Sequence, residues 1–134
     1  SLCYSLLPGR IYINWEGREE RGSVKKQDYQ AVRQDIKQRL LHFTHPQTGA
    51  KIIDKVFFRE EIYSGPYLND AADIIVEPHR GFDLKAKVGS DAQLFENSHI
   101  SGMHTYDDAF IMARNCDISS VVSIQDVKAA ILGK

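Results

Sequence analysis

One stretch of the chain has the periodicity of an amphipathic helix. Its apolar residues recur at steps of three or four, as they do on one face of a helix: Tyr29, Val32, Ile36, Leu40 and Phe43. The spacing predicts a helix over residues 29–43 that needs an apolar surface to pack against. Basic residues such as Arg33 and Lys37 fall mostly elsewhere on this helix. We expect them to form its solvated face, with anion binding as the alternative.

Short runs of β-branched, aromatic and other apolar residues can supply that surface. They predict strands at residues 11–14, 52–58, 74–76 and 109–113. A closing helix is expected near residues 124–132, with Ser123 as its N-cap and Gly133 as its C-cap. Strand and helix signals interleave, which is typical of α/β or α+β proteins. We predict the α/β class, with residues 11–14, 74–76 and 109–113 in a central sheet and the 29–43 helix packed against it.

The segments between these elements are less regular. Residues 2–7 are mostly apolar and end at Pro8-Gly9, and residues 59–67 have the polar and aromatic character of a loop. Residues 79–105 show no clear periodicity. A long irregular segment in a compact domain tends to be either functional or mobile.

Size and composition exclude several classes of protein. The 134 residues fit a single domain, and 43% of them are apolar, which is enough for a core. With 18 acidic and 17 basic residues the chain is not suited to holding a nucleic acid polymer, which calls for clustered cations. No apolar run approaches the ~20 residues of a membrane span, so we expect no membrane association and a cytoplasmic location. Cys3 and Cys116 are too few for a disulfide framework and are expected to be buried free thiols.

Residues 99–110 hold the densest group of chemically active side chains. His99, His104, Asp107 and Asp108 lie there among Ser, Thr and Tyr residues, just ahead of the last predicted strand. Imidazole and carboxylate groups are natural ligands for Zn²⁺ or Mn²⁺. The alternative is a polar loop in which an Asp makes a turn and a His packs. The spacing alone completes no metal site, and the sequence contains neither a G-x-S-x-G elbow nor a Gly-rich phosphate loop.

The order of several segments carries a resemblance to a known family. The segments are residues 10–14, 17–19, 29–41, 48–49, 59–67 and 72–76, and Glu61-Ile62-Tyr63-Ser64-Gly65-Pro66-Tyr67 is the most specific of them. Together they resemble the C-terminal part of type I phosphodiesterase/nucleotide pyrophosphatase-like proteins of the alkaline phosphatase superfamily. Residues 102–110 resemble the late motif of that family, a His after Gly-x with an Asp three residues on, and the closing helix resembles its last helix.

The resemblance implies an alkaline-phosphatase-like sheet with flanking helices, and a hydrolase acting on phosphate esters or nucleotides. In that family two divalent metal ions, commonly zinc, lie over the C-terminal ends of a central sheet and stabilise an in-line displacement. The resemblance makes His104 a metal ligand. It places Asp107 beside that ligand rather than on the metal. It assigns no catalytic residue to this sequence.

The departures from the family pattern are equally informative. The nucleophilic Thr or Ser and the other metal ligands have no match here, and by family order they should precede Ser1. We therefore expect residues 1–134 to be the C-terminal region of a larger phosphodiesterase, inactive as an isolated fragment because a catalytic metal needs about three protein ligands. A non-enzymatic binding domain and a cofactor-independent phosphoglycerate mutase relative are the alternatives. A piece of a larger sheet should expose an apolar edge, which predicts a homodimer.

Overall fold

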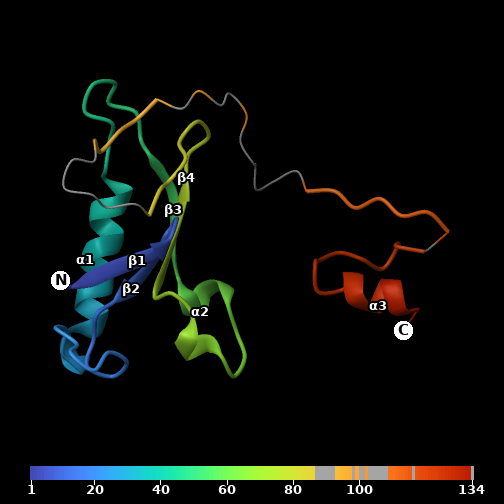
Figure 1. The fold of residues 1–134 in the computed structure, drawn as a ribbon, viewed down its shortest axis with the longest axis horizontal. Coiled ribbons are helices and arrows are strands. Elements are labelled where there is room, and N and C mark those ends of the chain that lie inside the picture. Colours follow the sequence, from blue (N-terminus) through green and yellow to red (C-terminus); the bar gives the residue numbers. More distant parts are fainter. Residues whose placement is uncertain (87–92, 98, 100–101, 103–108, 116, 134) are drawn as a thin grey trace. The chain divides into compact units, whose positions relative to one another are not determined.

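The computed structural model describes residues 1–86, 93–97, 99, 102, 109–115 and 117–133. The chain forms two compact units, Ser1–Met103 and His104–Lys134. The first unit contains the sheet and its helices, and the second contains the closing helix (Figure 1).

A four-stranded sheet organises the first unit, with the strand order β1-β2-β4-β3 and antiparallel pairing between all neighbours. The strands are β1 (Cys3–Leu7), β2 (Arg10–Ile13), β3 (Ile53–Phe58) and β4 (Ile74–Pro78). Three of the four predicted strands are thus confirmed to within two residues at each end. Strand β1 was not predicted, because the apolar run before Pro8 does not by itself reveal a strand. The observed class is a mixed α/β fold.

The turn between β1 and β2 depends on a glycine. Gly9 has a φ of +67° and its carbonyl oxygen accepts a hydrogen bond from the Val76 amide at 2.9 Å. A Cβ atom at Gly9 would lie 2.6 Å from the Val76 carbonyl oxygen, closer than real Cβ contacts allow. The hairpin therefore approaches β4 at a distance that only a glycine permits.

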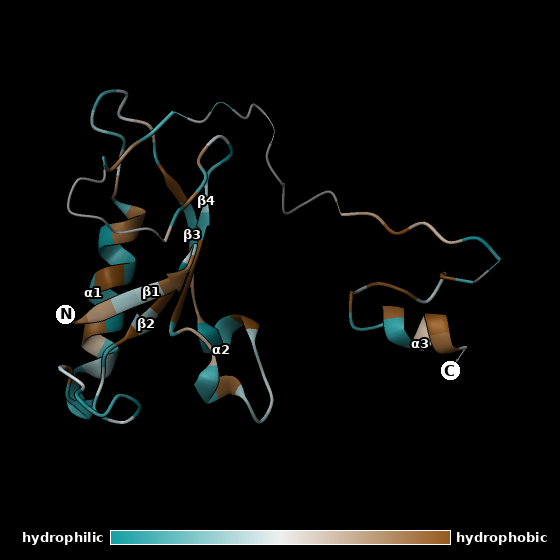
Figure 2. Ribbon diagram, viewed as in Figure 1, coloured by the Kyte–Doolittle hydropathy of each residue, from teal (hydrophilic) through white to brown (hydrophobic). Residues whose placement is uncertain are grey.

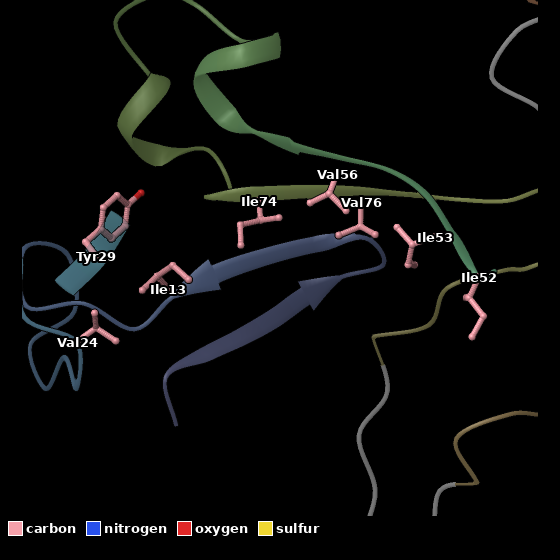
Figure 3. Packing of buried hydrophobic residues seen from close by; sticks show 8 residues of the cluster. All are labelled: Ile13, Val24, Tyr29, Ile52, Ile53, Val56, Ile74 and Val76. Carbon is pink, nitrogen blue, oxygen red and sulfur yellow. The ribbon is translucent and has the colours of Figure 1, made fainter. Parts of the chain in front are cut away.

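Helix α1 (Tyr29–Leu41) packs on the sheet as its periodicity predicts. A short 3₁₀ turn, η1 (Lys26–Asp28), precedes it. Figure 2 shows both apolar and polar residues along α1, and Val32, Ile36 and Leu40 pack against the buried core. The core residues come from the sheet, α1 and the segments beside them (Figure 3): Ile13, Val24, Tyr29, Ile52, Ile53, Val56, Ile74 and Val76.

Segment 59–67, expected to be a loop, begins with a single helical turn. Helix α2 (Arg59–Ile62) follows β3 directly, and Glu61 Oε2 accepts a hydrogen bond from the Phe58 amide at 2.5 Å. This bond satisfies one of the backbone donors that a helix start leaves free. The chain then passes through the 3₁₀ turn η2 (Leu68–Asp70) before it enters β4.

The prediction of a strand at residues 109–113 is wrong. These residues have no regular structure, and the Phe110 and Met112 side chains are 86% and 84% exposed. A strand needs a neighbour to hydrogen-bond with, and the described residues of the second unit contain no strand that could provide it. A short apolar run therefore forms a buried strand only where another part of the chain can pair with it and cover it.

The closing helix α3 spans Val127–Leu132 and starts later than expected. The prediction of Ser123 as the N-cap is wrong, because Asp126 occupies that position. Ser123 lies in the turn before the helix, where its amide donates a hydrogen bond to Asp126 Oδ2 at 2.8 Å. Gly133 ends the helix with a φ of +64°, which confirms it as the C-cap. Among the described residues, no helix combines the length and apolar character needed to cross a membrane.

Candidate functional site

The residues predicted to bind and orient a metal, His104 and Asp107, lie outside the described part of the chain, as does Cys116. Within the described residues, no group of three or more His, Cys, Asp or Glu side chains is placed to hold a metal ion. Cys3 is a half-buried free thiol, and burial raises its pKa. The metal centre therefore stays a prediction from the resemblance.

Two of the described histidines, His42 and His79, lie at the ends of secondary-structure elements and have contacts there. His42 directly follows α1, and its Nδ1 atom lies 2.7 Å from the carbonyl oxygen of Gln38, as expected for a histidine at a helix end. His79 follows β4, and its Nδ1 lies 3.7 Å from Asp54 Oδ1. Neither residue is part of a cluster suited to catalysis.

A buried carboxylate forms the most highly connected polar centre of the sheet unit. Asp73, directly before β4, is fully buried. It accepts hydrogen bonds from the Tyr29 hydroxyl at 2.5 Å, the Ile13 amide at 2.7 Å and the Arg18 guanidinium at 2.9 Å. The guanidinium of Arg59 lies 3.4 Å from Asp73 Oδ1, the oxygen atom that also accepts the Tyr29 hydrogen bond. One side chain thus links β2, the turn that contains Arg18, α1, α2 and the start of β4.

This environment changes the acid–base properties of its neighbours. Burial raises the pKa of Tyr29 to about 12, and the hydrogen bond to Asp73 adds to the shift because it holds the hydroxyl proton. Burial acts to lower the pKa of Arg18, but hydrogen bonds to Glu19 and Asp73 outweigh it and leave that pKa raised. A buried carboxylate that is held by two guanidinium groups, a hydroxyl and a backbone amide suits a structural role.

Arg33 corrects the prediction of a solvated basic face on α1. Its side chain is 1% exposed and makes two hydrogen bonds to the Glu60 carboxylate, at 2.7 and 2.8 Å. Its guanidinium carbon lies 4.2 Å from the Phe58 ring centroid and 5.0 Å from that of Tyr29. Helical periodicity cannot show this, because α2 provides the partner from 27 residues further along the chain. Lys37 is also engaged, with Glu61 at 3.3 Å.

An open pocket of about 360 Å³ lies on the sheet unit. It is formed where the β1–β2 hairpin meets the segment after α2, and its principal lining residues are Leu7, Arg10, Tyr12, Tyr63, Ser64 and Tyr67. Successive strand residues point to opposite faces, so Arg10 and Tyr12 face away from Ile11 and Ile13, which pack in the core. The pocket therefore belongs to the face of the sheet opposite α1.

The two pocket residues on β2 differ in how they are held. The Tyr12 ring stacks on Tyr4, with centroids 5.4 Å apart, and the Arg18 guanidinium lies 5.2 Å from its centroid. Arg10 donates a hydrogen bond to the Gly9 carbonyl oxygen at 3.2 Å. Within the part of the chain that the structure describes, no carboxylate lies within ion-pair distance of Arg10. The pocket thus combines a fixed aromatic wall with an uncompensated positive charge.

Segments far apart in the sequence converge on these two features. Residues 10–14 and 59–67 both line the pocket, and residues 17–19, 29–41 and 72–76 meet the first two segments at Asp73. Sequence reasoning did not assign Arg10, Tyr12 or Asp73 to a site. One signal could have indicated the Asp73 network: an Asp directly before an apolar strand is expected to be buried, and a buried carboxylate needs hydrogen-bonding or cationic partners.

Comparisons of the chain with protein-family models, with curated proteins and with solved structures found no match.

Proposed function

We propose that residues 1–134 are the C-terminal portion of a two-metal phosphodiesterase or nucleotide pyrophosphatase-like hydrolase with an alkaline-phosphatase-like fold. The observation that carries the proposal is the convergence of five of the segments on which the resemblance rests, residues 10–14, 17–19, 29–41, 59–67 and 72–76. Residues 10–19 and 59–76 are separated by about 40 residues of sequence, yet they meet at the Asp73 network and at the pocket. Segments that belong to one functional unit are expected to meet in space even when they are far apart in the sequence.

His104 is the proposed zinc ligand, and Asp107 the residue that orients it. The described residues contain no group suited to a metal ion, and the proposal takes the nucleophile and the remaining ligands from the part of the enzyme that precedes these residues in the family order. Bound metal ions in such an enzyme stabilise the oxygens of a phosphoryl group during displacement. Because one His cannot hold a catalytic metal, residues 1–134 alone should not hydrolyse phosphate esters. A cytoplasmic location is part of the same proposal.

The test is the rate of hydrolysis of a chromogenic phosphate diester, with Zn²⁺ or Mn²⁺, by a polypeptide that includes the sequence encoded upstream. His104→Ala should lower this rate by about 100-fold or more, since even partners that only orient a ligand are worth roughly 10–100-fold. His99→Ala is the matched control, because His99 lies in the same segment and has no assigned role. Full activity in His104→Ala would refute the ligand assignment.

A further inference from the structure

We propose that the pocket on the sheet unit binds a small aromatic anion, a planar ring that carries one phosphate or carboxylate group. This goes beyond the proposed function, because the pocket contains no metal-ligating cluster and its ligand requires no chemistry at a metal. The inference rests on a guanidinium, exposed tyrosine rings and a concave shape that lie together on one face.

The guanidinium of Arg10 specifies the anionic group. It has no carboxylate partner among the described residues, and its one protein hydrogen bond, to the Gly9 carbonyl at 3.2 Å, leaves other N–H donors free. The backbone that carries it is fixed, because Arg10 pairs with Ile75 in the sheet and Gly9 is bonded to Val76. A planar guanidinium on a rigid strand matches the paired oxygens of a carboxylate or phosphate.

The tyrosine rings specify the aromatic part. Tyr67 is 78% exposed and Tyr63 is 40% exposed, which leaves ring surface available for stacking. The segment that carries both rings is tied down, with the Tyr63 amide bonded to the Arg59 carbonyl at 2.8 Å and the Arg59 guanidinium bonded to the Asn69 carbonyl at 3.0 Å. The rings therefore sit on a preorganised support, which lowers the entropic cost of binding.

The size and lining of the pocket favour a small ligand. A volume of about 360 Å³ lies at the lower end of the range for small-molecule sites. Leu7, Leu68 and Ala72 provide apolar wall, and Ser64 provides a hydroxyl that can donate or accept a hydrogen bond. A lone cation in an apolar and aromatic pocket suits one anionic group rather than the repeated phosphates of a polymer.

The test is a titration of the 134-residue chain with four probes, followed by chemical shifts of backbone amides. The probes are phenyl phosphate, benzoate, benzyl alcohol and inorganic phosphate. We expect phenyl phosphate or benzoate, whichever supplies the preferred anion, to bind at least about tenfold more tightly than both benzyl alcohol and inorganic phosphate. The shifted amides should be those of residues 7–12 and 63–72.

Two variants and a matched control assign the contacts. Arg10→Gln should weaken binding of the preferred anion about tenfold, the effect of one charge-assisted hydrogen-bond pair, and should leave benzyl alcohol unaffected. Tyr67→Leu should weaken both aromatic anions, whereas Tyr67→Phe should retain binding. Arg21→Gln, an exposed arginine away from the pocket, should change nothing. The urea unfolding midpoint of each variant is measured alongside, and only variants whose midpoints equal that of the unmodified chain are compared, so that unfolding is not mistaken for lost binding.

Three results would overturn the proposal: no shift with any probe, inorganic phosphate binding as tightly as the aromatic anions, or an equal loss in Arg10→Gln and Arg21→Gln. These outcomes are separate from the failure of the proposed function, which is measured by hydrolysis and by His104→Ala. A chain that binds phenyl phosphate in the pocket would support this inference even if no hydrolysis were found.

Discussion

Removal of the Asp73 carboxylate should destabilise the sheet unit more than any other single change to a charged residue. The side chain is fully buried and has four partners: the Tyr29 hydroxyl, the Ile13 amide and the guanidinium groups of Arg18 and Arg59. The two arginine side chains are only 21% and 12% exposed, so water cannot fully replace the lost charge. Breaking a buried charge network costs about 3–5 kcal/mol, and we expect this loss for Asp73→Ala.

The assay is urea unfolding followed by the fluorescence of Trp15, the only tryptophan of the chain. Its ring centroid lies 5.2 Å from that of Tyr29, so it reports directly on this part of the fold. Asp54→Ala is the matched control, because its carboxylate is 42% exposed and lies 3.9 Å from the exposed Lys55 ammonium. It should cost less than about 1 kcal/mol. A loss below about 1 kcal/mol for Asp73→Ala would refute the structural role of the network.

Individual contacts of Tyr29, Arg33 and Gly9 can be tested by single substitutions. The pKa of Tyr29 is about 12 in the folded chain against 10 for the free side chain, so it contributes stability that is complete below pH 10 and is lost as the pH rises through 12. In urea unfolding at several pH values, Tyr29→Phe should remove about 1–3 kcal/mol of this pH-dependent stability. Arg33→Ala should lower the free energy of unfolding by about 3 kcal/mol, because it leaves the Glu60 carboxylate and two aromatic rings without their cation. Arg39 is 79% exposed, so Arg39→Ala should cost less than about 0.5 kcal/mol. Equal losses in the two variants would contradict the buried role of Arg33. Gly9→Ala should destabilise the chain more than Gly49→Ala, because both glycines have a φ near +67° but only a Cβ atom at residue 9 would clash with a carbonyl oxygen. Equal decreases in the calorimetric unfolding midpoint would refute the close packing of Gly9 against Val76.

The exposed apolar side chains of the edge strand bear on the expected homodimer. Leu6 and Leu7 of β1 are 69% and 59% exposed, at an edge that has no neighbour among the described strands. If the dimer forms through this edge, Leu6→Lys should shift the chain to a monomer in size-exclusion chromatography with light scattering. A monomer for the unmodified chain at high concentration would contradict the expectation.

Local sequence patterns predicted the elements that have a partner nearby in the fold. The 3.6-residue periodicity found α1, and the β-branched runs found β2, β3 and β4, because in each case the apolar face meets the same core. Residues 109–113 have a similar composition and yet form no strand, since composition records a tendency to be buried and not the presence of a neighbour. Strand β1 was missed for the opposite reason: the edge position lets its leucines stay exposed, so no alternating pattern is required.

The polar contacts of the sheet unit could not be read from the sequence because they join distant segments. Asp73 meets Arg18 across 55 residues, and Arg33 meets Glu60 across 27. Nothing in the local pattern of α1 distinguishes Arg33 from the exposed Arg39, since both are basic residues of one helix. The pocket was missed likewise, because it forms only when the hairpin and the 63–72 segment come together.

The central claim, a two-metal centre to which this chain contributes His104, is tested most directly by metal content. The polypeptide that includes the upstream sequence is dialysed against Zn²⁺, desalted and analysed by mass spectrometry of the bound metal. The claim predicts about two zinc ions per polypeptide, a loss of about one in His104→Ala and no loss in His99→Ala. Unchanged zinc content in His104→Ala would contradict it.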